Sequence, residues 1–166
     1  MINEETLNYF KLLPEKIIVT VHKAPDYDAI GSLLAMGALL KYLGRDATLY
    51  SPDINIKQLK HLPGIKKIIR IPKSEYDLGI FLDCSDQSRI SHPNDFPNTT
   101  KIMNIDHHQD NTHFGDINVV HNISSVGEIL FNLFIMSIMS DFLYLDITFN
   151  GLNILFTFNS LLSYSS

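Results

Sequence analysis

The sequence predicts an α/β fold with an open, mostly parallel sheet and helices packed on its faces. The first supporting observation is the run IIVTV at residues 17–21, whose continuous β-branched character is typical of a strand buried on both faces. The second is the strongly apolar helical pattern that follows this run as far as residue 43. The third is the alternation of strands and helices, which favours right-handed crossovers between parallel strands.

Capping residues and breakers place the boundaries of the first elements. Asn3, followed by two glutamates, predicts the start of a helix, and Pro14 predicts its end. The second helix is expected to begin near Ala29 and to close at Gly44, a residue type common just after a helix. Short strands are predicted at four further places, residues 47–51, 67–71, 78–83 and 101–106.

Composition and charge narrow the functions that fit the chain. Its 166 residues, 45% of them hydrophobic, suffice for one globular domain with its own core. The net charge of −5 argues against a broad electrostatic grip on duplex nucleic acid. The single cysteine, Cys84, cannot form an internal disulfide, and the first residues do not resemble a secretory signal, so a cytoplasmic location is expected. The uncharged stretch 147–166 is too polar for a membrane span, so no membrane partner is expected.

Histidine and carboxylate side chains gather just after three of the predicted strands. They are His22, Asp26 and Asp28 after the first, Asp83 at the end of a later one, and Asp106, His107 and His108 at the end of the last. Because the carboxyl ends of parallel strands meet at one edge of a sheet, we expect these loops to converge. Imidazole and carboxylate ligands suit manganese, magnesium, iron or zinc, and a carboxylate can bridge two such ions. The sequence therefore predicts a pair of divalent metal ions at this edge.

Each of these residues also has an ordinary structural explanation. Asp28 would serve equally well as the cap of the helix that follows it, and Asp83 as a turn residue. His22 would fit as a half-buried histidine at a strand end, and two adjacent histidines occur by chance on solvated loops. Only the joint occurrence of the three groups after three strands favours a functional site.

Three motifs, HKAPDYDAIGS, LDCSDQSRI and IDHHQDNTHFGDINVV, occur in this order between residues 15 and 130. In order and spacing they resemble the DHH phosphoesterase family. The AIGS that closes the first motif and the NTHFGD that follows DHH resemble the branch of oligoribonucleases, or nano-RNases, that also dephosphorylate 3'-phosphoadenosine 5'-phosphate. The resemblance implies a Rossmann-like DHH domain and manganese as the usual metal.

Carried over to this chain, the family pattern implies a set of ligands for two metal ions. His22 and Asp26 would hold one ion, and Asp28 and His107 would hold the other. Asp83 would bridge the two ions. Lewis acidity and a metal-activated water would then perform most of the chemistry, so that no covalent nucleophile is needed.

The resemblance assigns the remaining polar residues to substrate. His108 would contact the scissile phosphate as a donor or an acid, and Asp106 would orient the histidine pair from behind. Arg89 and Asn111 are expected near phosphate or sugar. For these two residues a structural alternative stays open, because Arg89 could pair with Asp86 and Asn111 could only shape its loop.

Residues 131–166 depart from the family's pattern. Their only charged side chains are Asp141 and Asp146, and the family's further metal-binding aspartate is not recognisable among them. The C-terminal substrate-binding domain of the family is also expected to be absent. We therefore interpret residues 1–130 as a DHH phosphoesterase domain and 131–166 as an atypical apolar tail, truncated or read in another frame. Alternatively, the tail covers the sheet or meets a second copy of the chain in a homodimer.

The leading hypothesis is a metal-dependent phosphoesterase that acts on short single-stranded RNA or on 3'-phosphoadenosine 5'-phosphate. Cyclic-dinucleotide phosphodiesterase and manganese pyrophosphatase are the nearest alternatives within enzymes. A catalytically inactive fragment that binds metal or nucleotide is the alternative from another class. A dinucleotide-binding domain is disfavoured, because Gly31, Gly37 and Gly44 do not form the G-x-G-x-x-G turn after the first strand.

Overall fold

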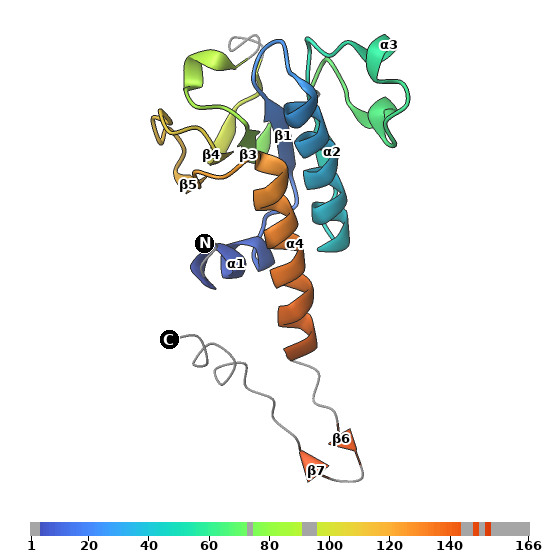
Figure 1. Ribbon diagram of the computed structural model, residues 1–166, viewed down its shortest axis with the longest axis vertical. Coiled ribbons are helices and arrows are strands. Elements are labelled where there is room, and N and C mark those ends of the chain that lie inside the picture. The colour runs from blue at the N-terminus through green and yellow to red at the C-terminus, as the bar shows by residue number, and fades with distance from the viewer. Residues whose placement is uncertain (1–3, 73–74, 91–95, 144–147, 150–151, 154–166) are drawn as a thin grey trace.

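Five parallel strands form the central sheet of the computed structural model, which describes residues 4–72, 75–90, 96–143, 148–149 and 152–153. Across the sheet they lie in the order β2 (Ala47–Leu49), β1 (Ile17–Val21), β3 (Tyr76–Leu82), β4 (Thr99–Asp106) and β5 (Ile117–Val120). Helices α2 (Tyr27–Tyr42) and α4 (Val126–Leu143) pack against the sheet (Figure 1). The predicted α/β fold with an open parallel sheet is thus confirmed.

The register of the central strands places three loops side by side. Val21 lies opposite Leu82, and Leu82 lies opposite Ile105. The residues that follow these positions are therefore neighbours at the carboxyl edge of the sheet. They are His22, Asp83 and Asp106.

Helix α2 (Tyr27–Tyr42) begins two residues earlier than the sequence predicts, because its cap is Asp26. The Oδ1 atom of Asp26 accepts a hydrogen bond from the backbone N–H of Ala29 at 2.9 Å. Asp28 lies inside the first turn and is not the cap of this helix. The predicted end is confirmed at Gly44, whose φ of +74° is the left-handed conformation that glycine adopts readily.

Helix α4 (Val126–Leu143) packs against α2, and helix α1 (Glu4–Lys11) lies beside α4 (Figure 1). One face of α4 is buried in the core, including Val126 and Leu133, whereas Phe131 on the opposite side is 62% exposed. A capping interaction starts the helix, since the Glu128 N–H donates to Ser125 Oγ at 3.1 Å. Within the described part of the chain, no helix is both long and apolar enough to cross a membrane.

The predicted domain boundary at residue 130 falls inside α4. Beyond this helix the structure describes only β6 (Thr148–Phe149) and β7 (Leu152–Asn153), which pair in antiparallel orientation. Most of the tail, residues 144–147, 150–151 and 154–166, lies outside the described residues. The predicted truncation or change of frame therefore stays a prediction.

The structure lacks one strand that the sequence predicts and contains one that it does not predict. Residues 67–71 do not form a strand, because a 3₁₀ helix covers Ile65–Lys67 and only Ile69 pairs, through a single bridge to Tyr50. Within this segment Ile68 is 4% exposed and belongs to the core, whereas Ile71 is 81% exposed. The second difference is β5, a short, half-exposed strand for which the sequence shows no clear alternation.

Replacing Ile80 by alanine is expected to lower the free energy of unfolding by about 2–5 kcal/mol. Ile80 lies in the middle of β3 and is 0% exposed, so the smaller side chain leaves a cavity in the main core. Urea denaturation of the purified chain measures the change. Ile71→Ala is the matched control, because Ile71 is 81% exposed and its loss should change stability by less than about 0.5 kcal/mol. Equal effects of the two variants would contradict the packing described here.

Candidate metal centre

A pocket of about 290 Å³ opens at the carboxyl edge of the sheet, where the loops after β1, β3 and β4 meet the start of α4. Its walls carry most of the histidine and carboxylate residues that the sequence singles out. The lining residues are His22, Asp26, Asp28, Asp83, Arg89, His107, His108, Ser124 and Ser125. The convergence of the three loops on one edge is therefore present in the structure.

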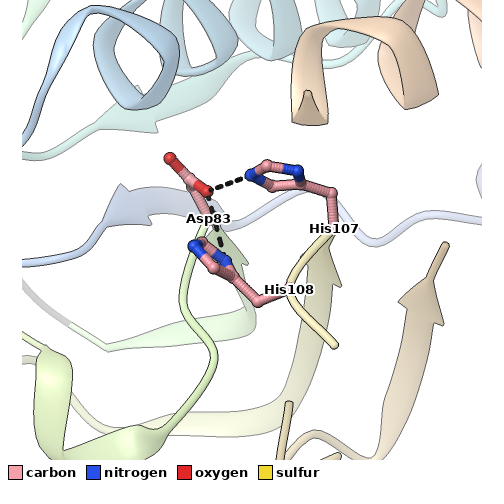
Figure 2. A group of neighbouring side chains, drawn as sticks. All are labelled: Asp83, His107 and His108. Carbon is pink, nitrogen blue, oxygen red and sulfur yellow. Dashed lines mark ion pairs between the residues drawn. The ribbon is translucent and has the colours of Figure 1, made fainter. Parts of the chain in front are cut away.

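Asp83 is at the centre of the pocket. Its side chain is buried, and its φ of +58° lies in the left-handed region, a strained conformation that surrounding contacts must maintain. Oδ1 lies 3.4 Å from His107 Nε2 and 3.6 Å from His108 Nδ1 (Figure 2), and Oδ2 lies 3.7 Å from His22 Nε2. Oδ1 has no hydrogen-bond partner although it is buried, which is costly unless another group, such as a cation, satisfies it.

His22 and His107 present the same ring nitrogen to Asp83. In His22, Nδ1 lies 2.8 Å from the carbonyl oxygen of Lys23, and in His107, Nδ1 lies 3.1 Å from that of Ile123. A carbonyl oxygen only accepts hydrogen bonds, so each Nδ1 carries the proton and donates. The Nε2 atoms are left facing Asp83, as metal-binding imidazoles are usually held. Hydrogen bonding of its ring to Asp83 raises the pKa of His22 above its usual value, so that this nitrogen tends to hold a proton until a metal replaces it.

His108 is held differently from the other two histidines. Its Nδ1 donates to Asp106 Oδ1 at 2.8 Å, and Asp106 is completely buried. Because Nδ1 is occupied in this way, Nε2 is the nitrogen that His108 can offer to a ligand. This geometry suits a side chain that contacts substrate, with Asp106 behind it as the orienting group.

The ligand atoms form two groups that share Asp83. His22, Asp26 and Asp83 make up the first group, and Asp83, His107 and His108 the second. Within each group the candidate ligand atoms lie within 4.8 Å of one another. The first group contains the residues implied for one metal ion. The second group includes His108 where the family pattern implies an aspartate.

Asp28 lines the pocket but interacts with α4. Its Oδ2 accepts a hydrogen bond from the Val126 N–H at 3.1 Å, and its Oδ1 accepts one from Ser32 Oγ at 3.5 Å. A carboxylate is favourable there, because the first N–H groups of a helix lack partners within the helix. The structure therefore places Asp28 at the edge of the site and not within either group of ligand atoms.

Arg89 lies on the pocket wall, as expected for a residue that contacts phosphate. Its Nη1 donates a long hydrogen bond of 3.5 Å to Ser85 Oγ. The alternative pairing with Asp86 is not observed in the described residues. Asp86 instead accepts a hydrogen bond from the Ser88 N–H at 2.7 Å, and its hydrogen bonds to Ser88 lower the pKa of its carboxyl group.

Asn111 does not line the pocket, and its side-chain amide is bonded within the fold, while its expected contact with substrate stays a prediction. Its Nδ2 lies 2.6 Å from Asp106 Oδ2, 2.8 Å from Asn104 Oδ1 and 3.2 Å from the carbonyl oxygen of Cys84. Asn104, which is fully buried in β4, also donates to the Cys84 carbonyl oxygen at 3.0 Å. This amide brace joins the loop after β3 to the loop after β4. Sequence reasoning missed Asn104, although an asparagine inside a buried strand could have indicated it.

Replacing Asn111 by alanine is expected to lower kcat by about 10–100-fold, because Asp106 then loses the partner that holds it against His108. Steady-state hydrolysis of a phosphate ester measures the effect. Asn118→Ala is the matched control, since Asn118 bonds only to the backbone of Gly115, at 3.1 and 2.6 Å, and should leave kcat near that of the unmodified chain. An unchanged kcat in Asn111→Ala would show that the brace does not matter for the site.

A sequence model of the DHH family, N-terminal domain, matches residues 16–152. This chain belongs to the DHH family. Members of the DHH family are metal-dependent phosphoesterases. The resemblance seen in the three motifs is thereby confirmed, and the family match extends well beyond them.

Two proteins to which this chain is similar come from Bacillus subtilis and Bacteroides fragilis. The chain is 28% identical over 124 residues to the bifunctional oligoribonuclease and PAP phosphatase NrnA of Bacillus subtilis strain 168, which covers 74% of this chain and 39% of NrnA. It is 26% identical to an exopolyphosphatase-related protein from Bacteroides fragilis, whose crystal structure superimposes with a TM-score of 0.67. That match covers 80% of this chain and 43% of the other. The chain therefore spans about two fifths of the length of these relatives.

Proposed function

We propose that the chain provides the metal centre of a phosphoesterase that cleaves short oligoribonucleotides, 3'-phosphoadenosine 5'-phosphate, or both. The observation that carries this proposal is the buried, unpartnered Oδ1 of Asp83 between two groups of ligand atoms. A carboxylate in that position fits a bridge between cations. The donor set contains only oxygen and nitrogen atoms, which suits manganese, magnesium, iron or zinc, and we propose manganese.

Two divalent ions at this site would act as Lewis acids and lower the pKa of a water molecule so that it can attack phosphorus near neutral pH. His22, Asp26 and Asp83 would hold one ion. His107 and Asp83 would hold the other, and Asp28 is close enough to the pocket to join them if it releases the Val126 N–H.

The other residues of the pocket would bind and orient the ester. His108 would donate from Nε2 to a phosphate oxygen or to the leaving group, while Asp106 keeps its ring in place. The guanidinium of Arg89, which also lines the pocket, would contact a second phosphate oxygen. Such fixed donors are effective because they are already oriented when charge develops on the phosphate.

The choice of substrate rests on the motifs and on the activity named for the Bacillus subtilis relative. The acidic chain, with a net charge of −5, fits a small or short substrate better than a duplex, and we propose a cytoplasmic location for the reaction. The enzymatic alternatives share the same centre. For that reason, assays with different substrates, and not measurements of metal binding, must distinguish these activities.

Incubation of the purified chain with Mn²⁺ and a panel of substrates tests the proposal. The panel contains a pentaribonucleotide, 3'-phosphoadenosine 5'-phosphate, a cyclic dinucleotide, pyrophosphate and polyphosphate. Release of mononucleotides or of phosphate from the first two supports the proposal. Preference for the cyclic dinucleotide, pyrophosphate or polyphosphate would assign another DHH activity. Metal binding without any turnover would favour the inactive fragment.

A further inference from the structure

A strongly basic segment lies beside the metal centre of an acidic chain. Between residues 54 and 72 there are five lysine or arginine residues and no aspartate or glutamate, although the net charge of the whole chain is −5. The five cationic residues are Lys57, Lys60, Lys66, Lys67 and Arg70, and all are exposed. Protein surfaces normally mix charges of both signs, so a run of one sign produces a local positive potential. We call residues 54–72 the basic segment.

The basic segment is anchored firmly to the fold. Its apolar residues Ile54, Leu59, Ile65 and Ile68 are at most 7% exposed and belong to the main core. Arg70 Nη2 donates to the Ile54 carbonyl oxygen at 2.6 Å, which ties the two ends of the segment together. The lysines are thus displayed on a fixed support, which includes the short helix α3 (Ile56–Leu59).

The basic segment lies at the same edge of the sheet as the metal centre. The basic segment follows the carboxyl end of β2, and β2 is the neighbour of β1 in the sheet. Near its end, the segment comes back to the end of β2, where the Ser51 N–H donates to the Ile69 carbonyl oxygen at 3.0 Å. Just before the segment, Asp53 Oδ2 accepts a hydrogen bond of 3.4 Å from Ala24, in the loop that carries His22 and Asp26. Figure 1 shows α3 at the end of the molecule where α2 begins.

The lysines of the basic segment are not explained by ion pairs with other described residues of the chain. In the part of the chain that the structure describes, Lys57, Lys60, Lys66 and Lys67 make no ion pair. The nearby pocket, by contrast, is lined by three carboxylates, Asp26, Asp28 and Asp83. Once metal ions neutralise these carboxylates, the lysines of the basic segment would attract an anionic chain that has one phosphate in the pocket.

We propose that the basic segment binds the phosphates of a single-stranded oligoribonucleotide whose end occupies the metal centre. The inference deepens the proposed function and rests on it for the class of ligand. Lysines act here as point charges along the backbone, so the contact is independent of base sequence. It should matter for substrates of several nucleotides, which extend beyond the pocket, and not for a single nucleotide that is held at the metal centre.

The test compares two triple variants with the same change in charge. Lys60, Lys66 and Lys67 are replaced by glutamine in one variant. In the control, Lys16, Lys41 and Lys101 are replaced, because they are exposed and lie at the opposite edge, before β1, at the end of α2 and early in β4. Binding of a labelled pentaribonucleotide with hydrolysis-resistant phosphorothioate linkages is followed by fluorescence anisotropy in Mn²⁺ at several salt concentrations, so that the pocket carboxylates are neutralised and hydrolysis does not interfere.

The basic-segment variant is expected to bind at least about tenfold more weakly than the control at about 50 mM salt. Its plot of log K against log salt concentration should be shallower by about 2, because three phosphate contacts on a single strand are lost. Equal affinities of the two variants, no binding by the unmodified chain, or lysine-dependent binding of polyphosphate without binding of the pentaribonucleotide would overturn the inference.

A hydrolysis assay separates this result from failure of the proposed function. With Mn²⁺, the basic-segment variant should show a KM for the pentaribonucleotide raised about tenfold and an unchanged KM for 3'-phosphoadenosine 5'-phosphate. If the unmodified chain hydrolyses neither substrate while the binding difference persists, the proposed function is wrong, but phosphate binding by the basic segment is supported. If hydrolysis is observed but the two variants behave alike, phosphate binding by the basic segment is wrong, but the proposed function is supported.

Discussion

Replacing Asp83 by asparagine is expected to reduce kcat/KM for any phosphate ester by at least about 10³-fold. The substitution keeps the size of the side chain but removes the negative charge that both groups of ligand atoms share. An asparagine offers one neutral oxygen and cannot bridge two cations as a carboxylate does. Both ions would then be held more weakly, and their positions relative to each other would be lost.

A second measurement ties this loss of activity to metal binding. At 100-fold excess over its Kd, a bound ion should stabilise the unmodified chain by about 2.7 kcal/mol, which corresponds to a rise in Tm of roughly 5–10 °C. Asp83→Asn should lose most of this rise. Asp77→Asn is the matched control, because Asp77 lies at the other end of β3 and is exposed. A normal Tm shift and normal turnover in Asp83→Asn would refute the proposed centre.

Metal binding is expected to weaken as the pH falls from 8 to 6, by about tenfold per unit once His22 is protonated. The pKa of His22 is raised, mainly by its hydrogen bond to Asp83, so competition by protons begins at a higher pH than for an ordinary histidine. Calorimetric titration of Mn²⁺ at several pH values measures this dependence. Affinity that does not change with pH would contradict the role of His22 as a ligand.

The metal-free chain should show the opposite dependence on pH. Because the pKa of His22 is higher in the folded state, its interaction with Asp83 stabilises the fold fully below the unfolded pKa, and this contribution is lost as the pH rises through the folded value. His22→Gln should remove this part of the pH dependence. His61→Gln is the matched control, because His61 is exposed within the basic segment and is not among the residues that line the pocket around Asp83.

Several features of this chain can be predicted from local sequence because short-range physical chemistry determines them. The β-branched run of β1 is typical of a buried strand, and Gly44 readily adopts the positive φ found at the end of α2. Because parallel strands bring their carboxyl ends to one edge, the convergence of the three loops was also predictable, and the resemblance of the three motifs indicated the family. These predictions needed no knowledge of distant contacts.

Other features of the site and the fold depend on contacts between residues that are distant in the sequence. Asp28 interacts with Val126, which is 98 positions away in the sequence, and no local pattern shows this contact. Asn111 was expected at the substrate, yet its amide points to Asn104 and Cys84. Residues 67–71 have the composition of a strand, but the 3₁₀ helix reaches Lys67, and Ile68 is buried in the core without pairing in the sheet.

Residue order alone thus sufficed to recognise an α/β domain with histidines and carboxylates after three strands, because periodicity and strand ends are local properties. Packing alone decided which atoms face each other. The left-handed backbone at Asp83, the carbonyl groups that orient His22 and His107, and the amide brace behind Asp106 all depend on contacts between different loops. Such contacts exist only once the sheet has brought those loops to the same edge.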